Sequence, residues 1–133
     1  QDFFISVAAV ADYKVKNSSP HKLKKENSKD TLTLELEANP DILASVAALP
    51  KPPFCIGFAA ESEKVLEYAR AKRLRKGIPM LIANDVSQAM GKSTNQITII
   101  TDDEELSFPE KEKLQAAEEI VQSLARHLDK LNL

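Results

Sequence analysis

The sequence predicts an α/β fold with a mainly parallel sheet. Short apolar runs, typical of strands buried on both faces, alternate with segments of helical periodicity. At 133 residues the chain has the length of one domain, and its hydrophobic (43%) and charged (29%) fractions are ordinary for globular domains. This composition excludes a disordered chain, a collagen and a disulfide scaffold. No apolar run approaches the ~20 residues of a membrane helix, and no secretory signal segment is visible.

The N-terminal third predicts two strands separated by a loop. Residues 3–10 form an apolar run and predict a strand buried on both faces. Because a domain rarely opens with its central strand, we expect the chain to be the later part of a longer polypeptide. Residues 13–30 are polar and lysine-rich and predict a loop, whereas residues 31–37 alternate with period two and predict a half-exposed strand.

A helix start follows at Asn39-Pro40-Asp41. Asn39 can cap the helix, Pro40 suits its first position, and Asp41 favours the positive end of its dipole. We expect the helix to reach about Leu49 and to be stopped by Pro50. The backbone N–H groups at such a helix start are a natural cradle for phosphate, although every helix has this feature.

The rest of the chain continues the alternation. Residues 54–59 and 79–83 predict buried strands, and residues 62–76 between them predict a helix with Ser62 as its cap and Gly77 as its stop. Residues 96–101 predict a further strand, followed by a turn at 102–105 and a hairpin partner at 106–108. Residues 110–130 predict an amphipathic helix whose apolar stripe is Leu114, Ala117, Val121, Leu124, Leu128 and Leu131.

Ligands of parallel sheets bind beyond the carboxyl ends of the strands. This rule selects Ala11-Asp12-Tyr13, Ala59-Ala60-Glu61 and Asn84-Asp85. Asp12 and Asp85 are candidates for holding a magnesium-bound phosphate or a ribose hydroxyl, and either could equally cap a turn. Asp12 is the candidate metal ligand.

Charge patterning favours a discrete anion site over a nucleic-acid track. The net charge is −2, whereas dedicated nucleic-acid binders are usually strongly basic. Basic residues nevertheless cluster twice, at 14–29 and at 70–76. In the second cluster Lys72 and Lys76 are four apart and share one helix face, where an anion could lie between them. The alternative is that both clusters are solvated surface.

Cysteine, histidine and glycine usage narrows the kinds of catalytic and binding site that the sequence predicts. Cys55 is the only cysteine, which excludes an internal disulfide, and its apolar surroundings predict an inert core residue. His21 and His127 show no metal-ligand spacing, and no Ser/His/Asp or Cys/His arrangement is visible. With 3 glycines the chain contains no glycine-rich phosphate loop.

Six motifs occur in an order that resembles one enzyme family. They are Ala8-Ala9-Val10-Ala11-Asp12-Tyr13, Lys22-Leu23-Lys24-Lys25, Asn39-Pro40-Asp41-Ile42, Gly57-Phe58-Ala59-Ala60-Glu61, Ala71-Lys72-Arg73-Leu74-Arg75-Lys76 and Ala83-Asn84-Asp85-Val86. Together they resemble the C-terminal part of bacterial phosphopantothenate–cysteine ligase (phosphopantothenoylcysteine synthetase), which is commonly fused to a decarboxylase in a bifunctional coenzyme A biosynthesis protein. The resemblance spans nearly the whole chain and implies a Rossmann-like three-layer fold.

The resemblance also implies a reaction and its site. The family uses CTP and Mg²⁺ to activate the carboxylate of 4′-phosphopantothenate as an acyl-cytidylate, which the amine of cysteine then attacks. FMN belongs only to a fused decarboxylase domain. The resemblance further implies a cytoplasmic homodimer that binds neither nucleic acid nor membrane. Asn84 is a candidate for substrate binding, and the positions matching nucleotide contacts are Ser6, Val7, Ala8, Asp12, Lys22, Pro40, Asp41, Ile42, Leu43, Phe58, Lys72 and Lys76.

Two departures from the family pattern limit what the resemblance implies. Residues 90–95 differ from the usual loop after Asn84-Asp85-Val86, and the glycine-rich N-terminal half is absent. We therefore interpret residues 1–133 as the C-terminal part of one ligase domain, inactive by itself. The alternative is a non-catalytic nucleotide-binding or regulatory module on the same fold.

Overall fold

The chain folds into two compact units. The computed structural model describes residues 2–21, 31–87 and 93–130. One unit comprises Gln1–Val7 with Ile42–Leu133, and the other comprises Ala8–Asp41. The lysine motif at 22–25 lies outside the described residues, as do residues 90–92 of the 90–95 loop.

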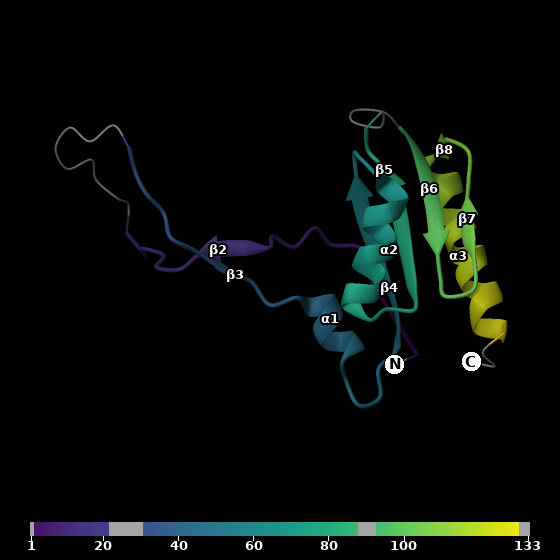
Figure 1. Cartoon of the computed structure of the whole chain (residues 1–133), viewed down its shortest axis with the longest axis horizontal. Helices are drawn as coiled ribbons and strands as arrows, with labels where there is room; N and C mark the ends of the chain where they lie inside the picture. Colours follow the sequence, from purple (N-terminus) through teal and green to yellow (C-terminus); the bar gives the residue numbers. More distant parts are fainter. Residues whose placement is uncertain (1, 22–30, 88–92, 131–133) are drawn as a thin grey trace. The chain divides into compact units, whose positions relative to one another are not determined.

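A mixed sheet organises the first unit, with strand order β1-β4-β5-β6-β7 (Figure 1). The three strands β1, β4 and β5 are parallel, β6 runs antiparallel to β5, and β7 and β8 both pair antiparallel with β6. The α/β fold with parallel central strands is therefore confirmed. The strands are β1 (Phe3–Ser6), β4 (Phe54–Glu61), β5 (Met80–Asp85), β6 (Thr94–Ile100), β7 (Glu105–Ser107) and β8 (Lys111–Glu112).

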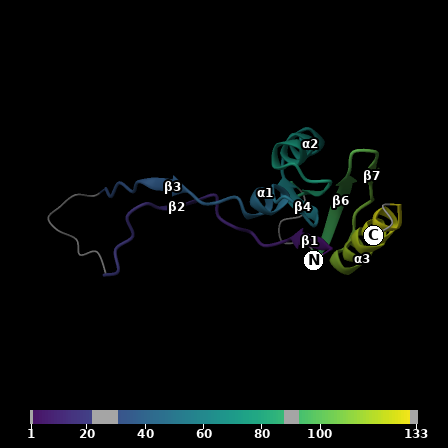
Figure 2. The ribbon, with the colours of Figure 1, turned by 90° about the horizontal axis from the view of Figure 1, so that it is seen from below.

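Helices cover both faces of this sheet, which completes the predicted three layers. The helices are α1 (Ile42–Ala47), α2 (Val65–Lys76) and α3 (Lys113–Lys130), and Figure 2 shows α2 and α3 on opposite sides of the sheet. The α2 face buries one cluster around Leu43, Cys55, Ala59, Ala69, Ile78, Leu81, Ala83 and Ile100. The α3 face buries a second cluster of Phe54, Ile56, Met80, Ile82, Ile97, Ile99, Ala116 and Leu124.

The first strand differs from its prediction. The apolar run at 3–10 predicted a strand buried on both faces, but β1 covers only Phe3–Ser6 and contains no fully buried residue. It lies at the edge of the sheet with β4 as its neighbour, so that Phe3 remains 48% exposed. The parallel strands that begin with four buried residues are instead β4 and β5, which have neighbours on both sides.

Helix α2 confirms one predicted end and not the other. It begins at Val65, and the residue before it, Lys64, has a left-handed backbone (φ 44°) and makes no side-chain cap. The predicted cap at Ser62 is therefore wrong. Gly77 does end the helix, with φ 63° and an N–H that donates to the carbonyls of Arg73 and Leu74.

Helix α3 has the predicted amphipathic character but a rotated buried face. Leu114 is 72% exposed and Val121 is 61% exposed, and Ala117 is exposed as well, so three of the five described stripe residues are wrong. Leu131, the sixth, lies outside the described residues. Ala116 and Leu124 are buried against the sheet, with Ile120 and Leu128 partly buried beside them. Small and aliphatic side chains on two adjacent sides of this helix made the choice of face ambiguous.

The second unit contains an antiparallel pair, β2 (Tyr13–Val15) with β3 (Leu36–Ala38). The predicted loop at 13–30 therefore begins with a strand, and the predicted strand at 31–37 is shorter and shifted. Ion pairs Lys14–Glu37 (3.3 Å) and Lys16–Glu35 (2.9 Å) join the two segments. Two-residue periodicity does not show such cross-strand pairs, because their partners are about twenty residues apart in the sequence.

Asn39 stabilises the second unit and does not cap α1. Its side-chain Nδ2 donates to the Ala11 carbonyl (2.8 Å), and its backbone N–H donates to the Asp12 carbonyl (2.8 Å). Helix α1 begins at Ile42, so the predicted start at Pro40 is early by two residues.

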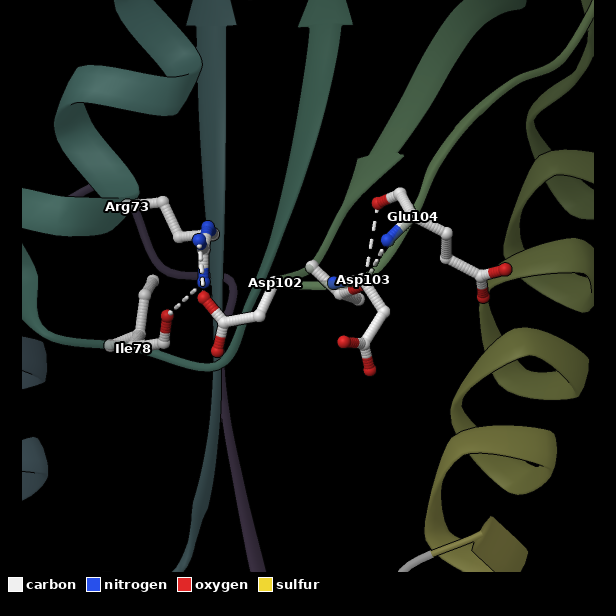
Figure 3. A network of polar contacts seen from close by, with 6 residues as sticks. Arg73, Ile78, Asp102, Asp103 and Glu104 are labelled. Carbon is white, nitrogen blue, oxygen red and sulfur yellow. Dashed lines mark hydrogen bonds and ion pairs between the residues drawn. The ribbon is translucent and has the colours of Figure 1, made fainter.

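A buried arginine ties α2 to the turn between β6 and β7 (Figure 3). Arg73 donates to the Ile78 carbonyl (3.3 Å) and to Asp102 Oδ1 (2.7 Å). The hydroxyl of Thr101 accepts from the backbone N–H groups of Asp103 and Glu104 and so orders the same turn. These contacts give Arg73, within the basic cluster at 70–76, a structural role.

Close packing at Gly57 gives the first prediction. A Cβ at this position would lie 2.8 Å from terminal methyl groups of both Ile78 and Leu43. Gly57→Val should therefore lower the free energy of unfolding by about 1–3 kcal/mol through overpacking. The control Ala60→Val lies on the same strand at an exposed position and should change it by less than about 0.5 kcal/mol. Chemical denaturation measures both, and equal effects would contradict the packing described for Gly57.

The rotated face of α3 gives the second prediction. Leu124 is 7% exposed and Leu114 is 72% exposed, although both belong to the stripe that the sequence predicts. Leu124→Ala should cost about 2–4 kcal/mol of unfolding free energy because it leaves a cavity. Leu114→Ala should cost less than about 0.5 kcal/mol. A larger loss of unfolding free energy for Leu114→Ala than for Leu124→Ala, measured by urea denaturation, would contradict the buried face described for α3.

Candidate functional site

The carboxyl ends of three parallel strands meet at one edge of the sheet in the first unit. Ser6 at the end of β1 pairs with Gly57 on β4. Further along, Ala60 and Glu61 at the end of β4 pair with Asn84 and Asp85 at the end of β5. The structure thus brings together two of the three strand ends selected from the sequence, and it adds Ser6 to them.

The polar residues at this edge divide between the two faces of the sheet. Glu61 and Asp85 follow Ala59 and Ala83, which belong to the α2 face, by two residues each, and alternate residues of a strand share a face. Ser6 shares that face with Phe4 by the same alternation. Phe58 and Asn84 belong to the α3 face, where Phe58 packs against the second cluster. The predicted set is therefore split into two groups.

Lys72 is held at the α2 face by Glu61. The Nζ of Lys72 lies 3.9 Å from Glu61 Oε1, and their side chains are 30% and 24% exposed. Lys76 lies one turn further along α2 and is half-buried. Because α2 starts at the carboxyl edge and runs away from it, Lys72 is the nearer of the two to the strand ends. Glu61 was noticed only as a polar strand end, and its pairing with Lys72 needed the fold.

Asp85 closes a turn after β5. Its Oδ1 accepts from the backbone N–H (2.9 Å) and from the hydroxyl (2.6 Å) of Ser87. The side-chain hydrogen bond from Ser87, followed by the backbone one, lowers the pKa of Asp85 below its ordinary value. Of the two roles open from the sequence, the turn-capping role is the one that this geometry supports.

Asn84 differs from its neighbours at the same edge. Its Oδ1 is buried and accepts no hydrogen bond, whereas the adjacent Asp85 is fully engaged. Phe58, on the same face, is half-buried. Sequence reasoning selected both residues through the resemblance, but it could not show that they share a face.

The remaining predicted residues are divided between the two units or lie outside the described residues. Val7, Ile42 and Leu43 belong to the first unit, and Leu43 is a core residue that is 7% exposed. Helix α1 has 6 residues, which is too short for its N-terminus alone to indicate a phosphate site. Ala8, Asp12, Pro40 and Asp41 belong to the second unit and are exposed. Lys22 lies outside the described residues.

The described residues bring no cluster of metal ligands together, and a small cavity lies at the amino ends of the parallel strands. Within residues 2–21, 31–87 and 93–130, no three His, Cys, Asp or Glu side chains come together as a metal site. A small cavity of about 230 Å³ lies at the amino ends of β4 and β5, lined by Ala47, Pro52, Pro53, Phe54, Cys55, Gly77 and Pro79. It offers no charged group, so we place the candidate site at the opposite, carboxyl edge.

Cys55 is a core residue, as predicted. It is 1% exposed, its thiol donates to the Pro53 carbonyl (3.4 Å), and burial raises its pKa. A raised pKa disfavours the thiolate and hence nucleophilic chemistry. Among the helices that the structure describes, none is long and apolar enough to cross a membrane.

Comparisons with known proteins bear on the whole chain. The sequence profile of the DNA/pantothenate metabolism flavoprotein C-terminal domain matches residues 1–128. The chain is 46% identical over 110 residues to the coenzyme A biosynthesis bifunctional protein CoaBC of Vibrio cholerae, covering 80% of this chain and 28% of that protein. It is 51% identical over 90 residues to CoaBC of Escherichia coli, covering 66% and 22%.

A solved structure shows the same architecture. The crystal structure of the C-terminal domain of CoaBC superposes with a TM-score of 0.73 and 32% sequence identity, covering 97% of this chain and 56% of that one. The chain thus spans less than a third of the length of the curated relatives and about half of the solved domain.

The turn at Asp85 gives the third prediction. Its lowered pKa means that its contribution to stability is present above the ordinary carboxyl pKa and is lost as pH falls through the lower folded value. Ser87→Ala should raise the Asp85 pKa toward 3.8, the ordinary value, and flatten the acid limb of stability below about pH 4. Carboxyl NMR titration measures the shift. An unchanged Asp85 pKa in the variant would contradict the assigned turn.

Proposed function

The chain belongs to the family of the DNA/pantothenate metabolism flavoprotein C-terminal domain, and from this premise we propose that it supplies part of the CTP site of phosphopantothenate–cysteine ligase in coenzyme A biosynthesis. The observation that carries the proposal is the match over residues 1–128, together with relatives named coenzyme A biosynthesis bifunctional protein. The polar strand ends at one edge of the sheet support it, because this is where α/β folds bind nucleotides.

The proposed reaction has two steps. The carboxylate of 4′-phosphopantothenate attacks the α-phosphorus of CTP, forming an acyl-cytidylate and releasing pyrophosphate. The amine of cysteine then attacks the acyl carbon, which forms the amide, releases CMP and leaves one proton for solvent. The protein must neutralise phosphate charge and orient the reactants, and it needs no histidine base.

Lys72 is suited to phosphate neutralisation. Its ammonium group is paired with Glu61 at 3.9 Å, which is long for an ion pair and leaves room for exchange. A phosphate oxygen can replace the carboxylate as the partner of Lys72, since both are anionic acceptors. Glu61 would then hold the lysine near the strand ends until nucleotide arrives.

In this proposal Mg²⁺ comes with the bound nucleotide, and FMN belongs to a separate domain. Because the described residues gather no cluster of metal ligands, we expect Mg²⁺ to arrive on the triphosphate, as it does in many nucleotide sites. It would lower the charge of the departing pyrophosphate. FMN would belong to a fused decarboxylase domain.

We also propose that the functional protein is a homodimer in the cytoplasm. The second unit supports a partner copy, because a two-stranded pair is only marginally stable alone. Its ion pairs Lys14–Glu37 and Lys16–Glu35 occupy one face. The other face presents Tyr13 and Leu36, which are 62% and 55% exposed.

Nucleotide binding gives the fourth prediction. Isothermal calorimetry should show that the chain binds CTP more tightly than ATP or UTP. Lys72→Ala should weaken CTP binding about tenfold, corresponding to one lost charged contact of about 1.4 kcal/mol. Lys22→Ala tests the second lysine that the resemblance selects.

Arg75→Ala is the matched control, because it removes one positive charge from an exposed position of the same helix. It should change CTP affinity by less than about twofold at physiological salt, where exposed charges are screened. Equal losses in Lys72→Ala and Arg75→Ala would indicate a general charge effect. Absence of CTP binding by the wild-type chain would favour a module without a nucleotide role.

A further inference from the structure

Asn84 carries a buried side-chain oxygen that accepts no hydrogen bond. Oδ1 has essentially no solvent-accessible surface, and no described residue donates to it. Leaving such an acceptor unpaired destabilises a fold on the order of tenfold in the folding equilibrium constant. Most buried polar atoms in folded proteins are therefore paired, and each exception needs a physical reason.

Among the described residues, the neighbours of Asn84 on its own and adjacent strands give no structural reason. The preceding residues of β5, Met80–Ala83, are buried and apolar. Across the sheet Asn84 lies between Ala60 on β4 and Ile97 on β6. Neither of these two neighbours has a side-chain donor that could pair with the amide oxygen.

The other unpaired buried atom among the described residues makes a useful contrast. Arg73 Nε is also unpartnered, but the remaining nitrogens of that guanidinium bond Ile78 and Asp102 (Figure 3). Arg73 therefore has a structural role despite one unsatisfied atom. Neither the sheet nor a turn uses the side chain of Asn84 in that way.

Ala60 and Phe58 lie beside Asn84 on the same face of the sheet, and neither is fully buried. Ala60, directly opposite Asn84 on β4, is small and exposed. Phe58 lies two residues earlier on the same face and is only half-buried. A phenyl ring, a methyl group and an amide thus line one side of the sheet at the carboxyl ends of β4 and β5. Planar groups stack well on such a ring.

We propose that Asn84 Oδ1 accepts a hydrogen bond from a planar N–H donor of the bound substrate, which lies against Phe58 and Ala60. This inference rests on the proposed function and adds an atom-level role at the same edge. Because Oδ1 is covered, the amide turns about its broad terminal torsion as the ligand enters. The substrates contain two donors of this chemistry, the 4-amino group of cytosine and the amide N–H of 4′-phosphopantothenate.

Asn84→Leu separates a ligand-binding role from a structural one. Leucine has a similar shape and no polar atom, so the variant removes the unpaired acceptor. The thermal unfolding midpoint without ligand should stay the same or rise. In the same variant, affinity for one of the two substrates should fall about tenfold. Asn84→Ala is the second variant, in case leucine is too bulky for the site.

Thr98→Val is the matched control, because it removes a polar atom that is already satisfied. The hydroxyl of Thr98 bonds that of Ser107 at 2.9 Å, on the opposite face from Asn84. This variant should lower the unfolding midpoint and leave both affinities within about twofold. We therefore expect opposite effects: Asn84→Leu lowers ligand affinity without lowering the unfolding midpoint, and Thr98→Val lowers the midpoint without changing affinity.

Calorimetry on the full chain with CTP, UTP and 4′-phosphopantothenate provides the readout. A loss for CTP with a collapsed preference over UTP identifies the cytosine amino group as the donor, and a loss for 4′-phosphopantothenate identifies its amide. If both Asn84 variants bind both substrates within about twofold of wild type, the inference is overturned while the proposed function stands. If the wild-type chain binds neither substrate, both fall together.

Discussion

The burial of the first four residues of both β4 and β5 is the constraint on which the rest of the first unit depends. Both strands contain runs of residues with almost no exposed surface, including Ile56, Met80 and Ile82. Strands that are apolar on both faces require cover on both faces, and parallel pairing requires a crossover between them. Helix α2 supplies the crossover and one cover, and α3 supplies the other. Parallel pairing then aligns the strand ends at one edge.

Polar side chains lie at that edge, at the ends of strands that are otherwise mostly apolar. Glu61 is paired with Lys72, and Asp85 is engaged by Ser87. Their neighbour Asn84 keeps an unpaired acceptor. This contrast between Asn84 and its two neighbours is the observation from which we propose a ligand-binding role for its amide.

Local patterns predicted much of the fold and little of the site's geometry. The strand at Phe54, the stop at Gly77 and the hairpin near Leu106 were predictable because their signals lie within a few residues of one another. The edge position of β1 and the pairing of β2 with β3 depend on distant partners. The exposed Leu114 could not be predicted either, since periodicity gives two possible faces for α3 and only the sheet selects one. The division of Ser6 and Phe58 between two faces likewise needed the strand register.

The central claim is that nucleotide binds at the carboxyl ends of the parallel strands. Hydrogen–deuterium exchange of the full chain, with and without saturating CTP, tests it most directly. We expect CTP to slow exchange at residues 57–61 and 83–87, because bound ligand shields these backbone amides from solvent. Exchange near Pro53 and Gly77, at the amino ends of the strands, should stay unchanged. Protection confined to those amino ends would contradict the account.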